Sequence, residues 1–187
     1  MGSLKQEQSD ERLITATLAG DDEAFAFLVA RYKRRIFALA SRFAYDRDEL
    51  DDICQEVFIK VYENLKKFRH DALFEHWIMR IAVHACHDSL RSRRHASKHS
   101  RLDDNFTELR DNAGEARYEA HQVRNFLRWA MARLKPDEQL VITLMELEEL
   151  SVRETAELTG WSESNVKVRA HRARQALKRI LEAHNER

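Results

Sequence analysis

Residues that break helices or turn the chain are scarce in this sequence, which has 4 glycines and 1 proline among 187 residues. Because sheets and long loops use many turn-forming residues, this composition predicts an all-α protein. The 2 cysteines, Cys54 and Cys86, are too few for a disulfide framework and indicate a reducing compartment. No stretch reaches the roughly 20 apolar residues of a membrane span. The polar, acid-containing start is unlike a signal peptide, so we expect a cytoplasmic protein.

An excess of charge is also missing, because 32 basic residues balance 32 acidic ones. A free-standing DNA-binding protein usually carries positive excess, since it must neutralise phosphates. Here the charges are separated along the chain. Residues 46–56 hold six carboxylates, whereas residues 91–101 hold five basic side chains and no acid. We infer basic surfaces for nucleic acid, an acidic surface for a basic protein partner, and weak DNA binding without that partner.

Patterns typical of enzymes are absent as well. The sequence has no glycine-rich phosphate-binding loop, and its carboxylates lie in charge runs rather than in convergent pairs. We therefore expect neither an enzyme, nor a cofactor, nor a small-molecule substrate.

Apolar residues recur at helical spacing in two parts of the chain. Residues 10–95 predict a three- to four-helix bundle with its own core, and Leu13, Ile14 and Leu18 of the first helix are expected to face inward. Periodicity is lost in residues 96–114, which predicts a flexible linker. It returns in residues 115–187, which predict a second domain of four helices.

The most informative stretch, residues 151–179, predicts a helix–turn–helix. Ser151 and Glu154 form a capping box that begins the first helix. Gly160 suits the left-handed residue at its end, and Ser162 can cap the second helix.

The second helix of this motif is strongly basic. It carries six basic side chains between Lys167 and Arg179 and no carboxylate. A helix–turn–helix of this kind fits the DNA major groove. The alternative is a solvated basic helix in an ordinary bundle. The residues opposite its apolar stripe, or flanking that side, are Ser164, Lys167, Val168, Arg169, His171, Arg172 and Gln175.

A second motif is the acidic start of the helix predicted over residues 48–68. Its polar positions, which leave the apolar stripe, are Asp51, Asp52, Gln55, Glu56 and Lys60. The alternative reading is that acids collect at a helix N-terminus because the helix dipole favours them there.

A third motif, residues 68–94, joins a polar break to an aromatic-bearing helix with a basic end. Interleaved aromatic and basic side chains are typical of single-stranded DNA binding. We expect Phe74 and Trp77 to lie in the core. The better candidates for DNA contact are the residues off the apolar face, in the break or in the basic end, namely His70, His76, Arg80, His84, His87, Arg91, Arg93 and Arg94. His84, Cys86 and His87 also raise the alternative of a metal site, although no second ligand pair is evident.

In this order, the motifs resemble those of the bacterial extracytoplasmic-function (ECF) sigma factors. The similarity covers roughly residues 21–94 and 115–181. The polymerase-binding helix of that family is similar to DELDDICQEVFIKVYENLKKF, and its minus-ten segment is similar to FEHWIMRIAVHACHDSLRSRR. Its minus-thirty-five reader is similar to LKPDEQLVITLMELEELSVRETAELTGWSESNVKVRAHRARQAL.

This resemblance implies a protein that binds core RNA polymerase, directs it to a promoter and helps to open the DNA. The positions that match the family's contact with the largest catalytic subunit are Asp51, Asp52, Gln55, Glu56 and Phe58. Residues 68–73 and the following helix match the elements that capture a base flipped out of the minus-ten duplex. His84 stands where the family often has asparagine.

In the second domain, the resemblance places Lys167, Arg169, His171 and Arg172 on minus-thirty-five DNA. Ser164 and Asn165 replace a common Gly-Thr pair, and Val168 replaces a frequent serine, so the promoter sequence does not follow. The family also implies an anti-sigma factor, often attached to a membrane. Two alternatives remain. One is an autonomous helix–turn–helix regulator that uses residues 10–95 for sensing or dimerisation, and the other is a metal-responsive protein.

Overall fold

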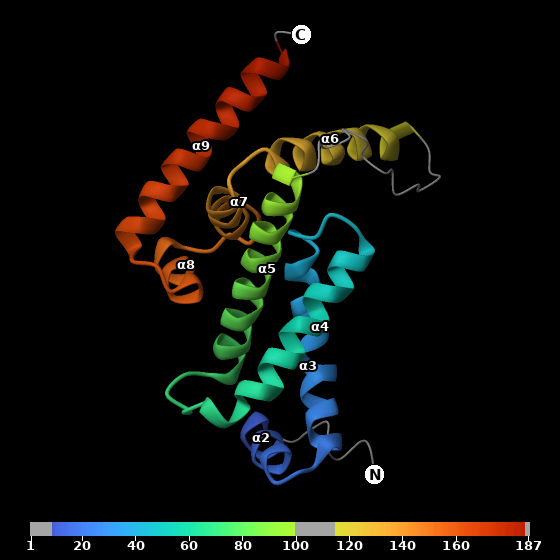
Figure 1. The fold of residues 1–187 in the computed structure, drawn as a ribbon, viewed down its shortest axis with the longest axis vertical. Helices are drawn as coiled ribbons and strands as arrows, with labels where there is room; N and C mark the ends of the chain where they lie inside the picture. Colours follow the sequence, from blue (N-terminus) through green and yellow to red (C-terminus); the bar gives the residue numbers. More distant parts are fainter. Residues whose placement is uncertain (1–8, 100–114, 186–187) are drawn as a thin grey trace. The chain divides into compact units, whose positions relative to one another are not determined.

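The computed structural model describes residues 9–99 and 115–185. These residues form helices and no strands, so the all-α prediction is confirmed (Figure 1). They divide into two compact helical units, and the division falls after Leu90, inside a long helix. That helix continues through residues 96–99, which the sequence had assigned to the linker. Residues 100–114, the rest of the predicted linker, lie outside the described residues.

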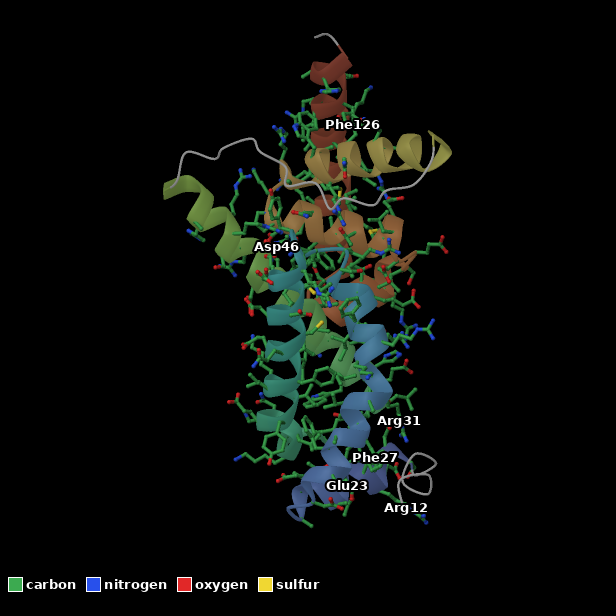
Figure 2. The ribbon with its side chains drawn as sticks, turned by 90° about the vertical axis from the view of Figure 1, so that its right-hand side faces the viewer. Arg12, Glu23, Phe27, Arg31, Asp46 and Phe126 are labelled. Carbon is green, nitrogen blue, oxygen red and sulfur yellow. The ribbon has the colours of Figure 1, made fainter. Side chains whose placement is uncertain are left out.

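The first unit is built from α2 (Asp10–Leu18), α3 (Asp22–Ala40), α4 (Arg47–Asn64), the short 3₁₀ helix η1 (Leu65–Lys67) and the part of α5 (Phe74–His99) that ends at Leu90. Asp21 and Asp46 begin α3 and α4, since their side chains accept hydrogen bonds from the backbone N–H groups of Ala24 and Glu49. The helices α3 and α4 lie side by side in antiparallel directions (Figures 1 and 2). The largest side chains sealed in this core include Leu13, Leu28, Ile36, Val57, Val61, Ile78 and Val83.

The helix α2 is held against α3 by polar contacts as well as by packing. The carboxylate of Asp10 accepts hydrogen bonds from the Tyr32 hydroxyl and from the guanidinium of Arg31, which Figure 2 labels on α3. Burial, together with the bond to Asp10, raises the pKa of Tyr32, which stays protonated as a donor.

One inward prediction in α2 is wrong, because Leu18 is 54% exposed. Leu13 and Ile14 are buried as expected. Thr17 takes the inward place in the last turn, since its angular position lies between those two residues on the helix. Its hydroxyl donates to the carbonyl of Leu13 at 2.8 Å, so the polar atom is satisfied in the interior.

The second unit contains the end of α5 from Arg91, α6 (Glu115–Ala132), α7 (Pro136–Ile142), a π-helical turn η2 (Thr143–Leu147), α8 (Val152–Thr159) up to Ala156, and α9 (Glu163–Asn185). Pro136 occupies the first turn of α7, where its missing N–H costs no helical hydrogen bond. The core of this unit is formed by Met131, Leu134, Val141, Ile142, Val166, Ala170 and Ala173. The ring of Phe126 on α6, which Figure 2 labels, packs against His184 of α9 with 4.7 Å between the ring centroids.

The predicted helix–turn–helix is present as α8 and α9. The Ser151 N–H donates to the Glu154 carboxylate at 2.8 Å, and the Glu154 N–H donates back to the Ser151 hydroxyl at 3.2 Å. Gly160 ends α8 with φ 74°, a left-handed conformation that glycine adopts without strain. The Ser162 hydroxyl accepts from the Asn165 N–H at 3.3 Å and begins α9. These caps fix where α9 starts, and therefore which of its side chains face outward.

Among residues 9–99 and 115–185, none of the helices combines the length and the hydropathy that crossing a membrane requires.

Candidate functional surfaces on three helices

The acidic side of α4 faces solvent, because Ile53, Val57 and Val61 turn the opposite side of the helix into the core. The exposed members of this acidic face are Asp51, Asp52, Gln55 and Glu56, and Phe58 is half-buried at its flank. Lys60 lies 3.2 Å from Glu56 and 3.5 Å from Asp88 of α5. Such exposed pairs contribute little to stability. One lysine leaves the acidic face with a net negative charge, which suits a basic protein partner.

Two exposed apolar residues on this side of α4 were not predicted from the sequence. Ile59 is 44% exposed and Tyr62 is 50% exposed. Intervals of three, four and three residues separate Asp52, Gln55, Ile59 and Tyr62 in turn, and this spacing puts their side chains on one helix face. The Tyr62 ring packs edge-to-face on Phe25 of α3, with 4.9 Å between centroids. A helical wheel of α4 would have shown that apolar surface continues the acidic face, a combination typical of protein interfaces.

The break between η1 and α5 lies beside a cluster of aromatic rings. Phe68 packs 5.4 Å from both Phe74 and Trp77, measured between ring centroids. Phe74 is buried, which confirms its expected core role, whereas Trp77 is only half-buried. His70 has a left-handed backbone at φ 58°, and its ring lies 4.6 Å from that of Phe68. Residues 69–73 are exposed above this aromatic base.

The remaining candidates for minus-ten DNA follow one another along α5. His76, Arg80, His84 and Arg91 are exposed, whereas His87, Arg93 and Arg94 are half-buried. Partial burial lowers the pKa of His84, and the neighbouring charges of Arg80 and Lys60 add to this effect against the opposing charge of Asp88. The His84 ring is therefore neutral at pH 7, since its ordinary pKa is already about 6.5. A neutral imidazole offers a hydrogen bond without adding charge.

The three residues of the alternative metal site are not brought together. Cys86 is fully buried in the core, whereas His84 is exposed on the surface of the same helix. In the part of the chain that the structure describes, no three His, Cys, Asp or Glu side chains gather closely enough to hold a metal ion.

The two thiols should react slowly in the folded protein. Burial raises the pKa of Cys86, and burial followed by the charge of Asp51 raises the pKa of Cys54. Because the thiolate is the nucleophile, alkylation of both thiols by iodoacetamide at neutral pH should be slower in the folded protein than in denaturant, with the larger effect at the fully buried Cys86. Mass spectrometry over a time course measures both sites. Rapid labelling of Cys86 without denaturant would mean that the core around α5 opens readily.

The outward side of α9 carries most of the residues predicted for minus-thirty-five DNA. Its exposed members are Ser164, Lys167, Val168, His171, Arg172 and Gln175. Val168 is 48% exposed, so an apolar side chain interrupts this polar surface. Asn165 and Arg169 differ from the others, because they are half-buried and hydrogen-bonded to each other.

Comparisons with known proteins agree with this arrangement. Residues 28–96 match the protein family described as sigma-70 region 2, and residues 127–177 match the family described as sigma-70 region 4. The chain is 33% identical to the RNA polymerase sigma-H factor of Pseudomonas aeruginosa, over 96% of each protein. It is 30% identical to the ECF RNA polymerase sigma-E factor of Escherichia coli K12, over 93% of this chain and 95% of the relative. Its fold matches that of CnrH, solved in complex with the cytosolic domain of CnrY, with a TM-score of 0.60, 26% identity, and coverage of 94% and 99%.

Two matched regions in this order, the second with an intact helix–turn–helix, define a transcription initiation factor of the sigma-70 type. The relatives align over nearly their whole length, and the chain belongs to the ECF group of RNA polymerase sigma factors. It binds core RNA polymerase and directs transcription initiation at specific promoters.

Proposed function

We propose that three separate surfaces divide the work of this sigma factor. The acidic face of α4 binds core RNA polymerase, the break before α5 and the outward side of α5 hold melted minus-ten DNA, and the outward side of α9 reads minus-thirty-five DNA. The observation that carries this proposal is the separation of charge. Asp51, Asp52 and Glu56 of α4 are exposed on one unit of the chain, and Lys167 and Arg172 of α9 are exposed on the other.

For polymerase, the supporting features are the acidic face itself and the apolar residues Ile59 and Tyr62 that continue it. Charge complementarity speeds encounter and selects the partner, while apolar area buried at the centre of an interface supplies affinity. The proposed contact residues are Asp51, Asp52, Gln55, Glu56 and Phe58, together with these two.

For the minus-ten element, the supporting features are an exposed break over an aromatic base and a row of polar side chains along α5. A base removed from the stack loses a few kcal/mol, which contacts to the flipped base must offset. We assign this role to His70, His76, Arg80, His84 and His87. The basic end of the row, formed by Arg91, Arg93 and Arg94, suits the phosphates that follow.

For the minus-thirty-five element, Arg172 is the strongest candidate for a base contact. It is exposed on the outward side of α9, one residue from His171 and four from Val168. A bidentate arginine on guanine contributes about 1–3 kcal/mol of discrimination. We expect Arg172→Ala to lower promoter-specific transcription by about 10- to 100-fold, with core polymerase binding unchanged. Run-off transcription from a promoter selected by the wild-type holoenzyme measures promoter-specific activity. Co-elution with core polymerase on a sizing column measures core binding.

Lys178→Ala is the matched control for this substitution. It removes the same charge from α9, but Lys178 pairs with Glu182 at 3.7 Å and lies beyond the matched region 4. Unchanged transcription by Arg172→Ala would contradict the assignment of α9. A loss of core binding by the same variant would show that this part of the helix is structural.

The remaining features of the proposal follow from the family. We assign residues 10–95 to polymerase binding and minus-ten DNA, residues 115–187 to minus-thirty-five DNA, and residues 96–114 to the connection between them. The protein works in the bacterial cytoplasm and catalyses no reaction of its own. CnrH is bound by the cytosolic domain of CnrY, and we propose that an anti-sigma factor likewise covers the polymerase and DNA surfaces of this chain.

A further inference from the structure

Arg169 makes three contacts inside the second unit, each with a different element. Its Nε donates to the Asp137 carboxylate of α7 at 3.0 Å. Its guanidinium carbon lies 4.1 Å from the ring centroid of Trp161, in the turn between α8 and α9. Its Nη1 donates to the side-chain carbonyl of Asn165, one turn earlier on α9. One side chain therefore joins α7, the turn and α9.

Arg174 plays a similar part on the other flank of α9. Its Nε and Nη2 both donate to Glu146 in η2, at 3.1 and 2.6 Å. At 100° per residue, Arg169 and Arg174 lie on opposite sides of the buried stripe that contains Val166 and Ala173. The helix is thus held from both edges of its buried face, while its outward side remains available for DNA.

We propose that Arg169 is a positioning residue that sets the angle and depth of α9, and that it does not contact DNA. This inference rests on the proposed function of α9 and separates its arginines into two kinds. Arg172 points outward and is exposed, whereas the Arg169 side chain is 25% exposed and its guanidinium is engaged by a carboxylate, an amide and an indole. Using the same guanidinium on DNA would cost those contacts.

Positioning matters here because base readout depends on geometry. A recognition side chain must be held within about 0.5 Å of its productive place. Trp161 is packed against the core of the unit, so the ring gives Arg169 a fixed surface to stack on. The planar guanidinium can stack and donate sideways at the same time, which a lysine ammonium cannot. Arg169→Lys should therefore behave like Arg169→Ala rather than like the wild type.

The first test uses the salt dependence of holoenzyme binding to a selected promoter duplex. Each phosphate contact that is lost lowers the slope of log affinity against log salt by about one. We expect Arg172→Ala to weaken promoter binding, as the proposed function requires. We expect Arg169→Ala to weaken promoter binding at least about tenfold with the wild-type slope. A slope lowered by about one in Arg169→Ala would overturn the inference and leave the function of α9 intact, whereas wild-type binding by Arg172→Ala would count against the function itself.

The second test uses Asp137→Ala, and here the two explanations predict opposite signs. If Arg169 contacted DNA, removing its acidic neighbour would strengthen binding. If Arg169 positions α9, removing that acid should weaken promoter binding by several-fold. Glu163→Ala is the control, since it removes an exposed acid from the first turn of α9 and should strengthen binding through charge alone.

A spectroscopic readout completes the test and reports on the contact directly. The share of Trp161 in the fluorescence spectrum is found by subtracting the spectrum of Trp161→Phe. That share should shift in Arg169→Ala, Arg169→Lys and Asp137→Ala, and should keep its wild-type position in Arg172→Ala. Circular dichroism at the assay temperature establishes that each variant is folded. An unchanged Trp161 spectrum in Arg169→Ala would show that the stacking does not exist in solution.

Discussion

Reversing the charges of Asp52 and Glu56 together should abolish the co-elution of this sigma factor with core RNA polymerase. Both carboxylates are exposed on α4, on the side opposite its buried residues. Placing two cations against a basic partner surface turns attraction into repulsion, which costs several kcal/mol. At ~1.4 kcal/mol per tenfold change, we expect Asp52→Arg/Glu56→Arg to lower affinity by at least about 100-fold. Size-exclusion chromatography of the mixture measures this loss.

The matched control changes net charge by the same amount away from the acidic face. Glu11→Arg/Glu23→Arg reverses two exposed acids on α2 and at the start of α3, where Figure 2 labels Glu23. This control should bind core polymerase like the wild type. Equal loss in both double variants would mean that net charge, not the acidic face, governs binding. Wild-type binding by Asp52→Arg/Glu56→Arg would remove the acidic face of α4 from the polymerase interface.

Local signals in the sequence predicted the framework well because short-range physics determines them. The capping box of Ser151 and Glu154, the left-handed Gly160 and the Ser162 cap all act within a few residues, and each was found as expected. Apolar periodicity likewise located the helices that carry the three surfaces. The extension of α5 to His99 was missed, because its last turns lack an apolar stripe to reveal them.

Contacts between distant elements were the part that sequence could not supply. Arg169 and Arg172 look alike in a run of basic residues, and only the fold shows that Asp137, 32 positions earlier, meets the first of them. The same limit applies to Leu18, whose inward place was taken by a threonine able to bond its own helix. Ile59 and Tyr62 are a different case, because helical spacing alone would have placed them on the same face of α4 as Asp52.

Removing Arg80 and His84 together should block promoter opening while sparing polymerase binding. Both side chains are exposed on α5, one helical turn apart. Flipping a base costs a few kcal/mol, and without contacts to the flipped base that cost is not offset. We expect Arg80→Ala/His84→Ala to lower run-off transcription from a duplex promoter by about 100-fold. Because the lowered pKa leaves His84 neutral at pH 7, the double variant loses one charge.

A template that is already mismatched across the minus-ten element isolates the opening step. It supplies the unpaired bases in advance, so transcription by Arg80→Ala/His84→Ala should recover to within a few-fold of the wild type. Arg34→Ala is the control, because it removes one exposed cation from α3 and should leave both templates unaffected. If the double variant failed equally on the duplex and the mismatched template, these residues would act after melting or in polymerase binding. Wild-type activity on the duplex would instead exclude this part of α5 from the minus-ten surface, and the exposed break at residues 69–73 would have to hold the flipped base alone.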